Sequence, residues 1–380
     1  MTDLVVVSLE SWDGVWRRNQ HLVAGLLRTD RSLRVLFVEP PTDPLHAART
    51  RQPPRRGRGL VAIDDVAGIG AGRLWAWQGT KWLPRRVDPG ADGRRAAGVR
   101  RAVDRLGWAA PIVWVNDPAG ARLLELTGWP ALYDITDDWL SAPRSSRELA
   151  RLTTQEDSLV SRCAQVVVCS PGLGVRKGER RSVTLVPNGV DLAGYLVDPA
   201  RPQDLPAGPV ALYAGTVHPD RMDLDLTVRT AQALQGIGRL VLVGPLPLTT
   251  GELDRLSAAG VVLLGPRPAE RIAAYLRHAD VLVVPHVVTA FTDSLDPIKR
   301  YEYQAAGRPV VSTPVAGFLD AGLPRVTVAG AADFPAVVAA ALGAARPGPL
   351  PPVDATVPTW ERRVGQMRVV LDRVASGMAS

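Results

Sequence analysis

The segment over residues 292–313, TDSLDPIKRYEYQAAGRPVVST, combines residue types that could hold a phosphate and a sugar. Pro297 is typical of a first helical position, so we expect a helix to begin there and the free N–H group of Ile298 to face an anion. Lys299 would add a positive charge. Glu302, about one turn later, would lie on the same side of the helix, within reach of a sugar hydroxyl. The pattern predicts a site for a phosphate attached to a sugar.

A structural alternative exists for the two charged residues. Lys299 and Glu302 stand three positions apart. On a helix such a pair is usually a surface ion pair that contributes only a few tenths of a kcal/mol. The functional interpretation therefore depends on the arrangement of the whole segment and not on either residue alone.

As a whole, the segment resembles the donor-binding element of GT-B-fold retaining nucleotide-sugar glycosyltransferases of the family 4 / group 1 type, in their teichuronic-acid-type branch. That element is written P-x-K-x-x-E-Y-x-A-x-G-x-P-V-V-S, and the residues that match it are Pro297, Lys299, Glu302, Tyr303, Ala305, Gly307, Pro309, Val310, Val311 and Ser312. The resemblance implies that the helix N-terminus holds the nucleotide diphosphate and that Glu302 binds ribose hydroxyls. Many relatives carry another glutamate eight positions earlier, where this chain has Ser294. Ser294 or Asp296 would then act differently from that glutamate.

The composition indicates a folded chain with two domains. With 380 residues the chain is too long for one ordinary core, and 46% hydrophobic against 22% charged residues is typical of globular proteins. The net charge is +7, but the basic residues concentrate in a Pro/Gly loop at 49–58 and along a helix at 94–105. Aromatic residues are not interleaved with them, which argues against nucleic acid. An anionic small substrate or an anionic membrane surface fits better, and a solvated arginine-rich surface is the alternative.

Location and cofactors can be predicted from what the sequence lacks. The two cysteines, Cys163 and Cys169, lack metal spacing and are expected in the core of a protein in a reducing compartment. No signal peptide precedes the first strand, and no apolar run approaches the ~20 residues needed to span a bilayer. We expect a cytoplasmic protein, with peripheral association with a membrane as the alternative. The absence of G-x-G-x-x-G argues against a dinucleotide cofactor, and Asp223 and Asp225 are interpreted as helix N-terminal charge, so no metal is assigned.

The first half of the chain begins with a strand, a helix and a second strand within forty residues, which is a βαβ unit. The loop after the first strand contains Asp13, Gly14 and Arg18, which we assign to the acceptor or phosphate side because ligands bind at that end of such sheets. A later strand runs out into Asp137 and Asp138, two carboxylates where α/β enzymes place their chemistry. A cap for the following helix is an equally good explanation of this pair.

The second half repeats the pattern of strand, glycine or proline turn, and helix, which predicts a second doubly wound sheet. The Pro-rich stretch 199–209 is the best linker, so we place the boundary near Asp198. We expect an N-terminal acceptor-binding domain over residues 1–197 and a donor-binding domain over 198–358. By the resemblance, the helix over 359–380 crosses back to the first domain. The predicted fold class is α/β of the GT-B type, with two Rossmann-like domains facing across a cleft.

The resemblance extends, in order, over six motifs along most of the chain. In addition to the segment at 297–309, these are W-x-x-N-Q-H at 16–21, V-E-P-P at 38–41, Y-D-x-x-D-D-W at 133–139, P-N-G-V-D at 187–191 and the loop that begins at Gly215. It implies that Arg221 takes the place of a lysine on the donor diphosphate, whereas the accompanying arginine is replaced by Thr216. It implies catalytic roles for Asp137, Asp138 and Lys299. The implied donor-binding residues are Gly215, Thr216, Arg221, Gly244, Arg267, Pro268, Asp296, Pro297, Ile298, Lys299 and Glu302.

The function implied by the resemblance is transfer of a sugar from a nucleotide-diphosphate-sugar donor to a hydroxyl acceptor, a natural product or a cell-envelope glycan. Retention at the anomeric carbon, a hexosyltransferase-type reaction, no metal and no cofactor would go with it. Two alternatives remain open. One is a nucleotide-sugar 2-epimerase of the same fold. The other is a protein that binds a sugar nucleotide without turnover, for which the departures at Ser294 and Thr216 argue.

Overall fold

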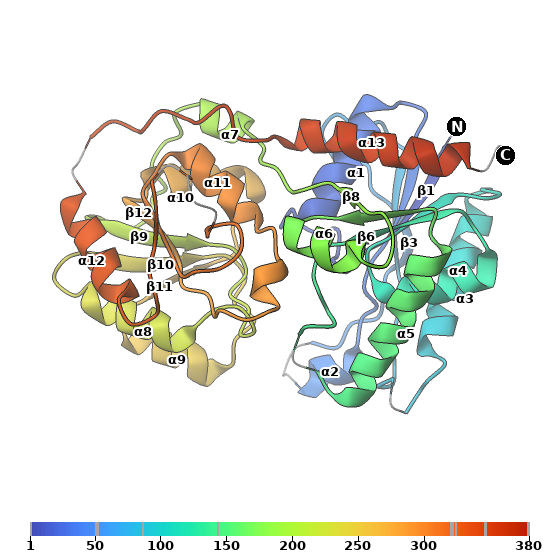
Figure 1. Cartoon of the computed structure of the whole chain (residues 1–380), viewed down its shortest axis with the longest axis horizontal. Helices are drawn as coiled ribbons and strands as arrows, with labels where there is room; N and C mark the ends of the chain where they lie inside the picture. Colours follow the sequence, from blue (N-terminus) through green and yellow to red (C-terminus); the bar gives the residue numbers. More distant parts are fainter. Residues whose placement is uncertain are drawn as a thin grey trace. The chain divides into compact units, whose positions relative to one another are not determined.

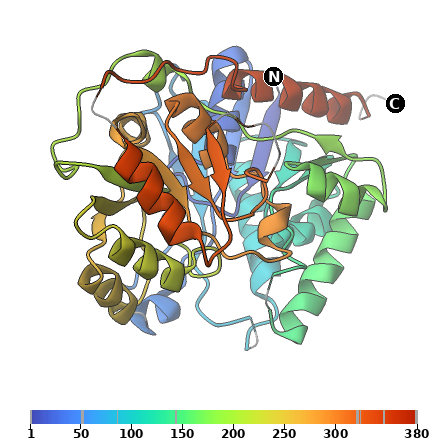
Figure 2. The same cartoon turned by 60° about the vertical axis from the view of Figure 1, so that its left-hand side comes forward.

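The structure is a computed structural model that describes residues 2–49, 53–85, 87–142, 144–319, 323, 325–345 and 348–377. The chain divides into two compact units, each with a sheet of its own (Figures 1 and 2). Unit 1 consists of Met1–Pro187 and Glu361–Ser380, and unit 2 of Asn188–Trp360.

Unit 1 contains an eight-stranded sheet in the order β3-β4-β2-β1-β5-β6-β7-β8, in which only the β3–β4 pair is antiparallel. Its strands are β1 (Asp3–Val7), β2 (Arg34–Val38), β3 (Gly59–Ala62), β4 (Leu74–Gln78), β5 (Ile112–Val115), β6 (Ala131–Ile135), β7 (Gln165–Val168) and β8 (Thr184–Leu185). Its helices are α1 (Arg18–Thr29), α2 (Pro44–Arg49), α3 (Ala91–Arg105), η1 (Pro118–Gly120), α4 (Ala121–Thr127), α5 (Ser146–Arg162), α6 (Pro171–Gly178) and α13 (Trp360–Ser376). The central strands are apolar and buried on both faces, as parallel strands covered by helices must be.

Unit 2 contains a six-stranded, fully parallel sheet in the order β11-β10-β9-β12-β13-β14. Its strands are β9 (Val210–Ala214), β10 (Arg239–Val243), β11 (Val262–Gly265), β12 (Val281–Val284), β13 (Val310–Ser312) and β14 (Val326–Val328). Its helices are α7 (Ala193–Leu196), α8 (Leu224–Ala233), α9 (Thr250–Ala258), α10 (Ala269–His278), η2 (Thr292–Ser294), α11 (Ile298–Ala306) and α12 (Phe334–Ala344). Within the unit this is the 3-2-1-4-5-6 order of dinucleotide-binding sheets, and the order reverses between β9 and β12. Ligands bind at the carboxyl end of such a switch point.

The boundary between the units corrects our expectation. It falls between Pro187 and Asn188, ahead of the Pro-rich stretch near Asp198 where we had placed it. The reason is that the segment after Pro187 packs within unit 2: Tyr195 is buried in the core of that unit, and Val190 forms a β-bridge with Thr359. The proline-rich stretch lies inside unit 2 as well.

The C-terminal helix α13 is part of unit 1, where it packs on α1 (Figure 1). Gly25 makes this contact possible, because a Cβ atom there would lie 2.3 Å from Cγ2 of Val364. Arg368 of α13 also forms an ion pair of 2.7 Å with Asp30. Helix α13 is thus held on unit 1.

The fold can be compared with the expectations about the two cysteines and about membrane-spanning segments. Cys163 and Cys169 are both buried in the unit 1 core, as predicted. Among the helices of the described residues, none is both long and apolar enough to cross a membrane.

Candidate functional site

Two glycine loops meet at the switch point of the unit 2 sheet. Gly215 follows β9 and Gly244 follows β10, and their φ angles of 133° and 138° lie where other residues are strained. A Cβ atom on Gly244 would lie 2.2 Å from the carbonyl oxygen of Gly215, and one on Gly215 would lie 3.3 Å from Nζ of Lys299. Glycine at both positions is therefore what lets the loops and the lysine approach one another.

Helix α11 begins beside these loops, and Pro297 is its N-cap residue instead of its first helical residue. Within the described residues no side chain caps this N-terminus. The N–H groups of the first turn, with Ile298 at its start, point out of the helix and favour an anion.

The turn before α11 is fixed by Asp296. Its carboxylate accepts hydrogen bonds from the Asn188 main-chain N–H at 2.5 Å and from the Tyr301 hydroxyl at 2.9 and 3.1 Å. Asp296 is buried, so this carboxylate orients the helix start and does not face a ligand. We had expected it to bind the donor directly.

Lys299 belongs to a hydrogen-bonded chain at the end of β9. Its ammonium donates to the Tyr213 hydroxyl at 3.0 Å and lies 4.5 Å from the centroid of that ring. The same hydroxyl donates to the carbonyl of Thr216 at 3.2 Å, and Nε2 of His286 lies 3.2 Å from it. A phenol has only one proton, so His286 must be the donor to Tyr213 when that proton goes to Thr216.

His286 is held neutral within this series of hydrogen bonds. Burial, then the charges of Lys299 and Arg221, keep its pKa well below the ordinary value. Arg221 stacks on the ring of Phe291 at 5.3 Å. The positive charges of Lys299 and Arg221 therefore both act on one buried imidazole at the carboxyl end of the sheet. A negatively charged ligand would reduce the repulsion between these two cations.

Glu302 lies one turn along α11 from Lys299. Burial raises its pKa to about 7, and the charge of Lys299 acts in the opposite direction. The carboxylate accepts no hydrogen bond within the part of the chain that the structure describes. It thus has unused acceptor capacity for hydroxyl donors.

Some expected donor-binding residues have other partners. The Arg267 guanidinium donates to Asp204 at 3.1 and 2.5 Å and to the Tyr275 hydroxyl at 3.0 Å. The adjacent Pro268 is the N-cap of α10. Ser294, which replaces the first glutamate of relatives, is buried and donates to the Phe291 carbonyl at 2.6 Å. Arg267 and Ser294 accordingly serve local structure.

In unit 1, the residues expected to face an acceptor or a phosphate differ in exposure. Arg18 is buried and forms a two-pronged ion pair with Asp134, with both N–O distances at 3.0 Å. It therefore does not point at a ligand, contrary to our expectation. Asp13 is exposed and accepts a hydrogen bond from the Val15 main chain at 2.9 Å, and the space around Gly14 is open.

The two neighbouring carboxylates that follow β6, Asp137 and Asp138, also differ. Asp138 is buried and accepts from Lys177 at 3.0 Å and from Ser141 at 2.6 Å. Burial alone would raise its pKa, but the hydrogen bonds of Ser141 and Lys177 and the charges of Lys177 and Arg176 outweigh burial and lower it. This carboxylate is committed to a structural ion-pair network. Asp137 is half-buried and accepts a hydrogen bond from Thr136 at 3.1 Å.

Several residues at or near the switch point of the unit 2 sheet were not singled out from the sequence. Tyr213 and His286 looked like strand and turn residues, and Tyr301 stood unremarked between matched positions. The pattern P-N-G-V-D, which contains Asn188, offered a signal, since it is part of the resemblance. No spacing rule links Asn188 to Asp296, because their contact spans 108 residues.

Comparison with known proteins assigns a family to this part of the chain. Residues 208–345 match the model of the family described as "Glycosyl transferases group 1". Unit 2 carries a group 1 glycosyltransferase domain. The match includes both glycine loops, Arg221 and the whole of α11.

Similar proteins support the same assignment. The chain is 26% identical over 219 residues to a putative teichuronic acid biosynthesis glycosyltransferase, TuaH of Bacillus subtilis (strain 168). The aligned stretch covers 53% of this chain and 55% of that protein, so the match spans about half the length of the relative.

Solved structures establish the fold of the whole chain. A UDP-forming α,α-trehalose-phosphate synthase from Burkholderia vietnamiensis has a TM-score of 0.58 at 15% identity, with 99% of this chain and 96% of that chain covered. Anabaena HepE in complex with UDP has a TM-score of 0.58 at 12% identity, with both chains covered completely at 100%. The predicted GT-B fold, with two parallel-sheet α/β domains, is confirmed.

The environment of Glu302 generates a prediction about pH. The folded-state pKa of about 7 lies above the ordinary 4.5, so between these values the folded protein binds more protons than the unfolded chain. This contribution to stability is present in full below pH 4.5 and is lost as the pH rises through 7. A shift of this size corresponds to ~3 kcal/mol. In urea unfolding at pH 4.5 and 8, Glu302→Gln should lose this part of the pH dependence.

The matched control is Glu270→Gln, at an exposed carboxylate of the same unit, which should keep the wild-type pH dependence. Equal pH profiles for wild type and Glu302→Gln would show that Glu302 has an ordinary pKa.

Proposed function

We propose that the chain is a glycosyltransferase that moves a sugar from a nucleotide-diphosphate sugar to a hydroxyl acceptor. The observation that carries this proposal is the cluster at the switch point of unit 2. There the uncapped N-terminus of α11, the ammonium of Lys299 and the guanidinium of Arg221 lie around two glycine loops, with Glu302 one turn away. The group 1 family match over the same residues supports it.

Each part of the cluster has a proposed role in donor binding. The diphosphate lies against the Gly215 loop and receives hydrogen bonds from the first turn of α11. Lys299 and Arg221 neutralise its charge, and Glu302 accepts hydrogen bonds from the ribose hydroxyls. Thr216 lacks the charge of the arginine in relatives, so Arg221 carries a larger share of phosphate binding.

The class of donor follows from the same chemistry. The solved structures of similar fold include a UDP-forming synthase and a protein in complex with UDP. We propose a nucleoside diphosphate sugar, and UDP sugars are the first to be tested. The donor sugar would be a hexose, and the acceptor a natural product or a cell-envelope glycan.

We propose a reaction with retention and without an enzymic nucleophile. The bond between the anomeric carbon and the phosphate oxygen breaks, its electron pair stays on the diphosphate, and the acceptor oxygen bonds to the same face of the sugar. The acceptor proton passes to the departing phosphate. Lys299 and Arg221 stabilise the charge that develops on this leaving group, so the proposal requires no metal ion. The side chain of Asp137 orients the acceptor or stabilises the positive charge of the sugar ring.

One observation favours a second candidate, a protein that binds the donor without turning it over. Ser294 stands where many relatives have a glutamate, and its hydroxyl is occupied by the Phe291 carbonyl. Analysis of products after incubation with a nucleotide sugar and an acceptor separates the candidates. A new glycoside indicates the transferase, an epimerised sugar a 2-epimerase, and an unchanged bound donor the binding protein.

The proposed donor site generates a prediction about donor affinity. Glu302→Ala should weaken binding of the nucleotide sugar at least tenfold, because each ribose hydrogen bond to a charged acceptor contributes ~1.5–3 kcal/mol. Lys299→Ala and Arg221→Ala should weaken binding in a salt-sensitive way. Calorimetric titration with UDP and UDP sugars measures this. Arg239→Ala, at an exposed arginine elsewhere in unit 2, is the control. Unchanged donor affinity in the Glu302, Lys299 and Arg221 variants would contradict the proposed donor site.

Asp137 generates a prediction about turnover. Asp137→Asn keeps the shape of the side chain and removes its charge, so kcat should fall by ~10² or more while donor affinity stays nearly unchanged. Steady-state kinetics and donor titration measure the two quantities. Asp138→Asn should instead lower the melting temperature, because it removes one of the two buried carboxylates, Asp138 and Glu156, that pair with the buried Lys177. Full turnover in Asp137→Asn would exclude this residue from the chemistry.

We also propose a peripheral contact of unit 1 with anionic membrane. Trp82 is 51% and Leu83 43% exposed, and the Arg56 guanidinium lies 5.3 Å from the Trp82 ring. Exposed aromatic and apolar side chains among basic ones are typical of the membrane interface. Trp82→Ala combined with Leu83→Ser should reduce co-sedimentation with vesicles that contain phosphatidylglycerol. Val175→Ser, at a residue 71% exposed in α6, should not. Equal binding to neutral phosphatidylcholine vesicles would contradict the proposal.

A further inference from the structure

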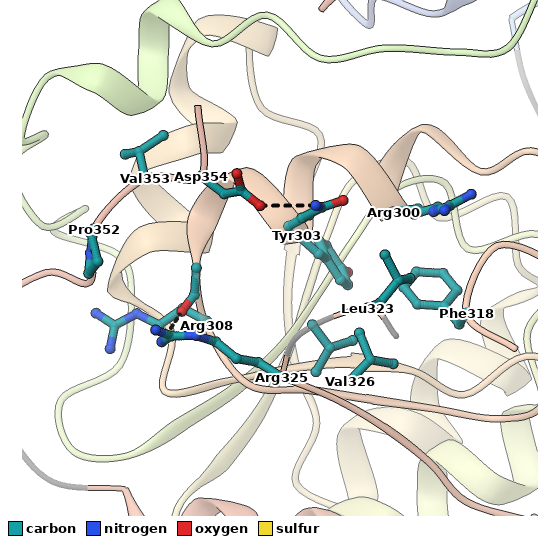
Figure 3. Close-up of a pocket in the computed structure, with 13 residues that line it drawn as sticks. Arg300, Tyr303, Arg308, Phe318, Leu323, Arg325, Val326, Pro352, Val353 and Asp354 are labelled. Carbon is teal, nitrogen blue, oxygen red and sulfur yellow. Dashed lines mark hydrogen bonds between the residues drawn. The ribbon is translucent and has the colours of Figure 1, made fainter. Parts of the chain in front are cut away.

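A pocket of about 240 Å³ lies along α11 in unit 2. The residues of α11 that line it are different from those that lie at the switch point of the sheet. Arg300 and Tyr303 line it from the helix (Figure 3). Gln304 is a further lining residue of the helix. Phe318 and Val326 form an apolar wall, and residues 352–354 close another side. Lys299 and Glu302, the proposed donor-binding residues of α11, are not among its lining residues.

The charges in the pocket are unbalanced. Three of its lining residues are arginines, Arg300, Arg308 and Arg325, against one acidic lining residue, Asp354. The Arg300 guanidinium lies over the ring of Tyr301, and the Asp280 charge acts on Arg308 from outside the lining, so Arg308 and Arg325 are the arginines that concern the pocket. The Asp354 carboxylate is already occupied, because it accepts from the Gln304 amide at 3.0 Å and from Thr356. The described part of the pocket therefore favours a negatively charged occupant.

Arg308 and Arg325 lie toward the C-terminal end of α11. Nε and Nη2 of Arg308 donate to the Arg277 carbonyl at 2.8 and 2.5 Å, and Nη1 of Arg325 donates to the Gly307 carbonyl at 2.8 Å. Fixing main-chain carbonyls is a structural explanation for both. However, a guanidinium has five N–H donors, and these bonds leave Nη1 of Arg308 and both Nε and Nη2 of Arg325 for a ligand within the described residues.

The backbone at Arg325 is a second, independent observation. Its φ of 66° makes it the one described residue other than glycine in the left-handed region. For a long side chain this conformation is costly, and such outliers gather at ligand sites. Glycine would adopt this conformation freely, yet arginine stands here with its side chain in the pocket.

We propose that this pocket is a binding site for a small organic anion, in which Arg308 and Arg325 hold a phosphate or carboxylate group and Phe318 and Val326 contact an apolar body. The two guanidinium groups supply the paired N–H donors that such an anion accepts. The apolar wall supplies affinity that an inorganic anion would not gain. The site is separate from the proposed donor site and does not depend on it.

Phenyl phosphate is the test probe because it combines both chemical features. In calorimetric titration of the full chain it should bind at least tenfold more tightly than inorganic phosphate or benzyl alcohol. Arg308→Gln and Arg325→Gly should each weaken binding at least tenfold. Arg325→Gly removes the guanidinium and relieves the backbone, so it is expected to fold even if Arg308→Gln does not.

Two controls locate the binding. Arg239→Gln, which removes an exposed charge elsewhere in unit 2, should leave the affinity for phenyl phosphate unchanged. Lys299→Gln should also leave it unchanged, because Lys299 belongs to the switch-point cluster and not to this pocket. Loss of binding in Lys299→Gln with retention in Arg325→Gly would overturn the proposal, and so would the absence of binding to the wild-type chain or equal affinity for inorganic phosphate.

Discussion

The close approach of two main-chain loops is the constraint on which the candidate site depends. The Gly244 backbone packs so tightly on the Gly215 carbonyl that a single methyl group would force the loops apart. The missing side chain at Gly215 leaves room for Lys299, because a Cβ atom there would lie 3.3 Å from Nζ, and the ammonium reaches the Tyr213 hydroxyl. A glycine at each position therefore decides where the lysine charge stands at the end of the sheet, and this is a matter of space before it is one of electrostatics.

Charge then accumulates at this position in a form that suits an anionic ligand. Lys299 and Arg221 both lower the pKa of the buried His286, which shows that their fields overlap at the imidazole. Glu302 offers little compensation, because burial keeps its carboxyl partly protonated near neutral pH. A diphosphate would supply the missing negative charge. Ribose hydroxyls that donate to Glu302 would favour its ionised form, so donor binding and loss of its proton should be linked.

The parts that could be predicted from sequence are those with a local signal. Apolar runs predicted most strands of both sheets, and in unit 2 these runs end in glycine or proline, but β3 and β14 were not predicted. The arrangement of Pro297, Lys299 and Glu302 predicted α11 and the residues on its ligand side. Partners far apart in the chain could not be predicted. Arg18 looked like a phosphate ligand after a strand, but its partner, Asp134, is 116 positions away and neutralises it in the core.

The prediction of the domain boundary near Asp198 was wrong for a similar reason. Proline and glycine around Asp198 mark a stretch that does not form regular structure, and this composition says nothing about which core the stretch packs on. Burial of Tyr195 in the unit 2 core decided the boundary instead.

Helix α11 shows how nine residues can serve several tasks at once. Lys299 and Arg300 are adjacent, but successive side chains on a helix differ by about 100° in direction, so one reaches Tyr213 and the other lines the pocket. Tyr303 joins the two regions: its ring lines the pocket, whereas its hydroxyl accepts a hydrogen bond of 2.9 Å from the Ala214 main chain, directly before Gly215. Because this ring is buried and packs on Phe318, it cannot shift without disturbing either the pocket wall or the Gly215 loop. The position of the helix is thus fixed by contacts on several sides, and the charged groups at its N-terminus are held in place before any ligand arrives.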